Sequence, residues 1–140
     1  LIYLHQHQVL FQNNSYVIIE SEKKKLSFCI DSLEKLNIKF IHLEGHTNTI
    51  GSIESNKLLS ENRVNAVIDY FTTNGSITIY KNSFGELKPR YPNKTKSGLE
   101  NNRQVIVSFG KKIKMQWVQG IIKDSITGIS KIKVFYKSLF

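Results

Sequence analysis

The chain has 140 residues, of which 40% are hydrophobic and 11% aromatic. This composition suits one domain with a core of ordinary size plus an appendage, and it leaves too little material for two complete domains. No run of about 18 apolar residues is present, which excludes a membrane-spanning helix within this sequence. No charged start followed by an apolar core marks a signal peptide, and the first residue is Leu1, so we expect the chain to be a piece of a longer protein.

The net charge of +9 first suggests a polyanionic partner such as nucleic acid or anionic lipid. The positive charge is unevenly distributed, however. Residues 111–140 contain seven lysines and one acidic residue, Asp124 (7 − 1 = +6), so residues 1–110 carry only 13 − 10 = +3. We therefore expect a domain at residues 1–110 and a basic, β-rich extension at residues 111–140.

The first predicted elements are a strand and an amphipathic helix. Residues 9–11 form an apolar run that ends at a polar cluster, which is typical of a strand leaving into a loop. The single cysteine, Cys29, lies on the apolar stripe of the helix, so we interpret it as a buried apolar residue rather than a reactive thiol. The helix is predicted at residues 21–36 because apolar side chains recur there at spacings of three and four, namely Leu26, Cys29, Ile30, Leu33 and Leu36.

A second strand and a second helix follow. Residues 40–44 are rich in strand-forming types, and we expect Gly45 to stop the strand. Ser55 or a neighbour is suited to cap the second helix, whose broad apolar face extends to Phe71. We expect Asn74-Gly75 to end this helix, because both residue types tolerate the left-handed conformation.

Residues 77–80 and 105–109 predict a third and a fourth strand, separated by a polar loop. Strands that alternate with helices favour crossover connections, so part of the sheet should be parallel. The predicted fold class is α/β (α+β): a two-layer sandwich with a βαβαβ-type mixed sheet and helices packed on one face.

The extension predicts a β-hairpin, because residues 117–122 and 129–136 flank a turn-like segment. Two strands alone bury no core, so the hairpin would be marginal by itself. Residues 120–128 resemble the opening of a carboxypeptidase-regulatory-like β-sandwich domain. One interpretation of the extension is therefore the start of a truncated β-sandwich.

The loop after the second strand carries the candidate binding residues. Residues 45–51 lead into the N-terminus of the second helix, which presents backbone N–H groups and favours anions. Arg63 lies on that helix, 63 − 48 = 15 residues after Asn48, and its planar guanidinium suits a bidentate grip on a carboxylate. A zwitterionic ligand with one carboxylate and one ammonium would fit such a pocket. The residues leave open a plainer alternative, in which Arg63 makes a surface ion pair and Asn48 makes a turn.

An ordered set of short motifs favours the ligand pocket over the plainer alternative. Leu43-Glu44-Gly45-His46-Thr47-Asn48 is followed in order by Gly51, Asn56, Leu59-Ser60, Arg63, Phe84-Gly85-Glu86, Pro89, Gly98 and Asn102-Arg103-Gln104-Val105. Together with Phe11 at the end of the first strand, this set resembles the signature of the OmpA-like C-terminal domain family, which includes peptidoglycan-associated lipoprotein and the flagellar stator protein MotB. The resemblance covers roughly residues 9–109.

The resemblance implies non-covalent binding of peptidoglycan through the diaminopimelate of its stem peptide. In the family, an arginine matching Arg63 takes the ligand's carboxylate, and an aspartate in the position of Asn48 takes its ammonium. Other residues are implied to shape or border the pocket, with help from main-chain N–H groups: Thr47, Asn56, Arg103, Phe11 and Gln12.

The chain departs from the family pattern in several places. Asn48 replaces the aspartate, which turns a charge-assisted hydrogen bond to the ammonium into a neutral one, roughly half as strong. Gln12 stands where relatives often have an acidic residue, and Leu99 and Gln104 replace basic positions common in the family. We therefore expect weaker binding, or a ligand without the free ammonium, such as an amidated or otherwise altered stem peptide.

Two alternatives of other classes stay open. His42, Glu44 and His46 would share one face of a strand, so they could form the metal site of a metal-dependent hydrolase. The similar His-Glu-x-x-His motif requires a helix, which Gly45 opposes, and we expect His46 to fix the loop by hydrogen bonds instead. The second alternative is a polyanion-binding protein that uses the lysines and aromatic residues of the extension.

No set of nucleophile, base and orienting residue is legible, so the sequence predicts a non-enzymatic binding domain without a cofactor or metal. The resemblance implies that it anchors an outer-membrane or periplasmic protein to the cell wall of a Gram-negative bacterium. Peptidoglycan is the expected partner. No nucleic-acid partner is expected, and membrane association is expected only through other parts of a longer protein.

Overall fold

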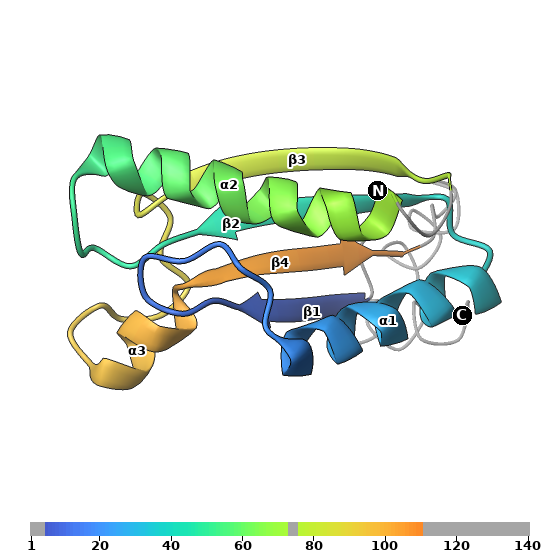
Figure 1. Cartoon of the computed structure of the whole chain (residues 1–140), viewed down its shortest axis with the longest axis horizontal. Helices are drawn as coiled ribbons and strands as arrows, with labels where there is room; N and C mark the ends of the chain where they lie inside the picture. Colours follow the sequence, from blue (N-terminus) through green and yellow to red (C-terminus); the bar gives the residue numbers. More distant parts are fainter. Residues whose placement is uncertain (1–4, 73–75, 111–140) are drawn as a thin grey trace, which may run out of the picture.

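The computed structural model describes residues 5–72 and 76–110. The predicted hairpin of the extension, its proposed β-sandwich start and the expected helix stop at Asn74-Gly75 lie outside these residues. Helices and strands alternate along the described chain (Figure 1), in the order β1 (His5–Leu10), α1 (Glu20–Lys35), β2 (Phe40–His46), α2 (Ile53–Thr72), β3 (Thr78–Gly85), α3 (Lys96–Asn101) and β4 (Gln104–Phe109).

The four strands form one mixed sheet in the order β1-β4-β2-β3. β2 and β3 are parallel, as their helical crossover predicts, and β4 is antiparallel to both of its neighbours. α1 and α2 lie on the same face of the sheet, while α3 lies at the end where β2 leads into α2 (Figure 1). The predicted two-layer fold with a mixed sheet is confirmed. Among the described helices, none is long and apolar enough to cross a bilayer.

The core lies between the sheet and the two long helices. Alternate residues of the strands point into it, including Ile41 and Leu43, both 0% exposed. Cys29 is buried there as predicted, and burial raises the pKa of its thiol to about 12, which keeps it protonated. The buried hydrophobic residues of this core are Val9, Phe11, Leu26, Cys29, Leu33, Ile38, Ile41, Leu43, Val64, Val67, Phe71, Val105, Val107 and Phe109.

Short polar motifs set the ends of the helices. Ser52, rather than Ser55, caps α2: its Oγ accepts from the Ser55 N–H at 3.1 Å, and Ser55 Oγ accepts from the Ser52 N–H at 3.1 Å. Asn37 ends α1 in the left-handed conformation, with φ +53°. The sequence did not predict α3, because its six residues include Gly98 and give no helical periodicity; a cap supports it, in which Thr95 Oγ1 accepts from the Gly98 N–H at 3.0 Å.

Gly45 does not stop β2, contrary to the prediction. The strand continues to His46, and the register with β3 shifts between these two residues. A Cβ at Gly45 would lie 2.6 Å from the Ser60 carbonyl oxygen and 2.6 Å from Val64 Cγ2. Gly45 therefore permits α2 to pack directly against the strand, which fixes the position of the helix that carries Arg63.

We predict that Gly45→Ala lowers the free energy of unfolding by about 1–3 kcal/mol, because the added methyl group must displace a helix backbone rather than a flexible side-chain end. Urea unfolding measures this change. The exposed Asn65→Ala on the same helix is the control and should change stability by less than about 0.5 kcal/mol. Equal stabilities of the two variants would contradict the close approach.

Candidate functional site

A pocket opens at the end of the sheet where β2 leads into α2. The β1–α1 loop, the β2–α2 loop and the turn from α3 into β4 meet at this end (Figure 1). The pocket has a volume of about 340 Å³. Its lining is formed by Asn13, Asn14, Thr47, Asn48, Ile50, Gly51, Ser55, Asn56, Leu59, Arg63 and Arg103.

Arg63 is one of these lining residues and is 0% exposed. Its guanidinium donates to three backbone carbonyls from two different segments. Nε donates to Ser15 at 2.8 Å, and Nη2 donates to Gln12 at 3.3 Å, both in the β1–α1 loop. Nη1 donates to His46 at the end of β2, at 3.0 Å. Since a guanidinium has five N–H donors, one on each of Nη1 and Nη2 remains for a ligand.

The Arg63 charge has no carboxylate partner among the described residues. The expected alternative of a surface ion pair is therefore wrong. Phe11 stacks under the guanidinium, 5.3 Å from its ring centroid, and gives partial compensation. Burial and the nearby charge of Arg103 lower the pKa of Arg63 to about 10, so it stays protonated at neutral pH. A buried cation held only by carbonyls and a ring is poised to accept an anion.

Asn48 makes the turn that the plainer alternative proposed. Its Oδ1 accepts from the Ile50 N–H at 3.1 Å, and its Nδ2 donates to the Leu99 carbonyl at 3.3 Å. The side chain thus links the β2–α2 loop to α3. It is 4% exposed and lines the pocket together with Arg63.

Thr47 and Asn56 are also buried and line the pocket, at 1% and 3% exposed. The Thr47 N–H donates to the Gly85 carbonyl at 2.8 Å, which joins the loop to the end of β3. Asn56 Nδ2 donates to the Asn48 carbonyl at 3.2 Å and to Glu86 Oε2 at 2.5 Å. Both side chains hold the shape of the loop around Asn48.

Arg103 also lines the pocket and is bonded to Phe11, the residue that follows β1. Its Nε donates to the Phe11 carbonyl at 2.9 Å, and the Phe11 N–H donates back to the Arg103 carbonyl at 2.8 Å. Phe11 and Gln12 lie outside the lining: the Phe11 ring is buried beneath Arg63, and Gln12 contributes its backbone carbonyl while its side chain is exposed.

Sequence reasoning missed several residues of the lining. Asn13 and Asn14 follow Phe11, and the only signal for them was a polar cluster at the end of a strand. Asn14 adopts φ +48°, a conformation that asparagine tolerates better than most residues. Ile50 and Leu59 lie within the candidate loop and the ordered motif, but their apolar side chains gave no chemical reason to predict them in the lining.

The metal-site alternative has a specific geometry. Glu44 lies between the two histidines on one strand face, with Oε1 3.7 Å from His42 Nδ1 and Oε2 3.6 Å from His46 Nε2. Arg90 Nη1 approaches the same carboxylate at 3.8 Å, and Asn82 Nδ2 lies 2.9 Å from His42 Nε2. Within residues 5–72 and 76–110, no group of His, Cys, Asp and Glu side chains is arranged to hold a metal ion.

His46 makes its hydrogen bond through the backbone carbonyl and not through its ring. Neither ring nitrogen has a hydrogen-bond partner in the described chain, and the ring packs against Phe84 at a centroid distance of 5.5 Å. The backbone carbonyl of His46 accepts a hydrogen bond from Arg63 and so joins the end of β2 to α2. Burial lowers the pKa of His46 below 6.5, although Glu44 opposes the shift.

We predict that wild type loses stability relative to His46→Gln as pH falls from about 7.5 to about 5.5. A lowered pKa means that the unfolded chain binds the proton more readily, so the cost appears below the unfolded pKa of about 6.5. Urea unfolding at the two pH values measures it. His7, whose pKa is also lowered by burial, contributes the same trend in both proteins. Identical pH dependence of wild type and variant would contradict the prediction.

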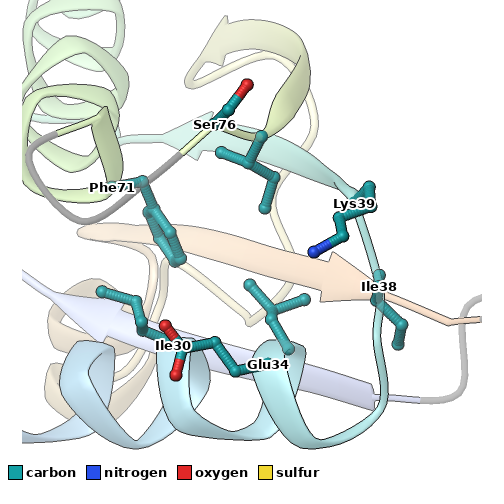
Figure 2. Close-up of a pocket in the computed structure, with 8 residues that line it drawn as sticks. Ile30, Glu34, Ile38, Lys39, Phe71 and Ser76 are labelled. Carbon is teal, nitrogen blue, oxygen red and sulfur yellow. The ribbon is translucent and has the colours of Figure 1, made fainter.

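A smaller hollow of about 120 Å³ lies at the opposite end of the fold, where β2 and β3 begin. Figure 2 shows Phe71 of α2 pointing toward Ile30 of α1 across it. Four of its eight lining residues are aliphatic, one is Phe71, and the polar ones are Glu34, Lys39 and Ser76. It offers no convergent set of polar groups. The pocket lined by Arg63 and Arg103, called the arginine pocket below, is therefore the better candidate site.

The mixed sheet with two helices on one face and a buried arginine that lines a polar pocket define a small α/β domain with one candidate ligand site. The chain belongs to the OmpA family, whose model matches residues 10–103. The outer-membrane lipoprotein YfiB of Pseudomonas aeruginosa is 32% identical over 102 residues, which are 71% of this chain and 61% of that protein. The putative lipoprotein YfiB of Escherichia coli is 28% identical, over 71% of this chain and 64% of its own length.

Solved structures share the fold. The peptidoglycan-associated lipoprotein from Burkholderia pseudomallei superposes with a TM-score of 0.67 at 22% identity, covering 74% of this chain and 89% of that one. The cell wall anchor of the type VI secretion system (T6SS) from Pseudomonas aeruginosa gives 0.57 at 23% identity, covering 74% and 76%. The chain spans about three-fifths of the length of the YfiB relatives.

Proposed function

We propose that this domain binds peptidoglycan without catalysis, by holding a carboxylate of the stem peptide on Arg63. The observation that carries the proposal is the buried Arg63 guanidinium with no carboxylate partner among the described residues. Arg63 lines a pocket of about 340 Å³, large enough for the end of an amino-acid side chain. A ligand carboxylate would supply the missing counter-charge through charge-assisted hydrogen bonds.

Family membership supports the choice of ligand. A structural relative is named a peptidoglycan-associated lipoprotein and another a cell wall anchor. We infer that the distal end of diaminopimelate enters the pocket, with Asn48, Thr47 and Asn56 shaping its wall and Arg103 lying opposite Arg63. One YfiB relative is named an outer-membrane lipoprotein and the other a putative lipoprotein. We therefore propose that the parent protein is held in the outer membrane or periplasm and reaches the cell wall through this domain.

We predict that Arg63→Ala and Arg63→Lys weaken cosedimentation with insoluble peptidoglycan by at least about tenfold, because a charged hydrogen-bonded contact is worth roughly 1.5–3 kcal/mol. Arg63→Lys retains the charge but loses the planar fork, so it separates geometry from charge. Arg90→Ala is the matched control: it also removes one arginine, but from outside the pocket, and should sediment like wild type.

Arg63 also joins the β1–α1 loop to the end of β2, so its replacement can weaken the fold. Circular dichroism and thermal unfolding of each variant therefore accompany the assay, and binding is compared well below the lowest unfolding temperature. A folded Arg63→Ala that sediments like wild type would overturn the proposed function.

A further inference from the structure

The charged side chains that line the arginine pocket are all positive. Its lining includes two guanidinium groups, Arg63 and Arg103, and no carboxylate. The two arginines are close enough for the charge of Arg103 to lower the pKa of Arg63. Glu86 contacts this region through Asn56 Nδ2, at 2.5 Å, but it is not part of the lining. A bound group therefore meets an excess of positive charge.

Asn48 does not supply the missing negative charge. Its amide is neutral, its Oδ1 is engaged by the Ile50 N–H, and its Nδ2 donates to the Leu99 carbonyl. Ser55 Oγ, another polar group of the lining, is engaged in the cap of α2. The side-chain oxygens of the pocket wall belong to amides and hydroxyls, and none of them carries a charge.

The positive charge of the pocket indicates which charge state of the ligand it favours. At the distal end of the stem-peptide diamino acid, a carboxylate and an amine are attached to the same carbon atom. With the carboxylate on Arg63, the amine must stay within a few ångströms of it, inside the field of both arginines. A free ammonium there has no anion to pair with and is repelled by the two guanidinium groups. An acylated amine is neutral, and the distal end then keeps one net negative charge.

We propose that the pocket selects stem peptides whose distal amine is acylated, as it is in a cross-link between two stems, over stems with a free ammonium. This inference rests on the proposed function, because it assumes that Arg63 holds the adjacent carboxylate. The acyl chain leaves through the pocket mouth, where Asn13 and Asn14 are exposed and Ile50 is 58% exposed. The domain would thus attach to cross-linked regions of the wall.

Two synthetic stem peptides that differ only in N-acetylation of the distal amine test the selection, with calorimetry or fluorescence anisotropy giving both dissociation constants. Wild type should bind the acetylated peptide about tenfold more tightly at low salt. Asn48→Asp, which restores a carboxylate to the wall, should bind the free-amine peptide more tightly than wild type does and reverse the order.

Asn48→Asp also loses the contact with Leu99, so a second variant keeps the test decisive. Asn14→Asp places a carboxylate at the exposed mouth without removing a hydrogen bond among the described residues, and Asp accepts the same left-handed backbone. It should shift the preference in the same direction as Asn48→Asp, by a smaller factor. His42→Gln, outside the lining, should leave the wild-type ratio unchanged.

The outcomes separate this inference from the proposed function. If both peptides bind in an Arg63-dependent manner and the free amine binds equally well or better, the selection is wrong while the proposed function stands. If neither peptide binds folded wild type, the diaminopimelate site itself is wrong. A preference for the acetylated peptide that neither aspartate variant reduces would also overturn the inference, because charge would not be its cause.

Discussion

The buried guanidinium of Arg63 is the interaction on which the rest of the site depends. It holds the carbonyls of Gln12 and Ser15 from the β1–α1 loop and that of His46 from the end of β2, above the ring of Phe11. These contacts satisfy part of its hydrogen-bonding capacity, and the ring compensates its charge only in part, since no carboxylate of the described residues pairs with it. A buried cation without an anion is costly. We take that cost as the physical sign that the binding partner, and not the protein, provides the counter-ion.

The fold supplies the precision that this arrangement needs. Gly45 lets α2 lie directly on β2, and this close packing sets the distance of Arg63 from the loops around it. The reciprocal cap between Ser52 and Ser55 fixes where the helix begins. Paired hydrogen bonds between Phe11 and Arg103 close the other side of the pocket against β4. The site is therefore built between the ends of regular elements, whose positions the core determines.

Periodicity was sufficient to predict most of the fold, because long amphipathic helices and β-rich runs carry strong local signals. Periodicity did not predict α3, because this six-residue helix has almost no apolar face and depends on the N-terminal cap that Thr95 provides. At the site, the sequence identified Arg63 and Asn48 through an ordered motif, and the structure places both in one pocket. It could not show that Arg63 is buried without an ion pair, nor that Arg90 approaches Glu44, since these facts depend on segments distant in sequence.

The central claim is that a ligand carboxylate neutralises Arg63. Nitrogen-15 NMR of the arginine side chains, recorded while a soluble peptidoglycan fragment is titrated into the labelled domain, tests it most directly. We expect the Nε and Nη resonances of Arg63 to shift and to become protected from solvent exchange, because the remaining N–H groups would be engaged, while those of Arg90 stay in place. If the fragment binds and the Arg63 resonances do not change, the carboxylate is held elsewhere and the account is wrong.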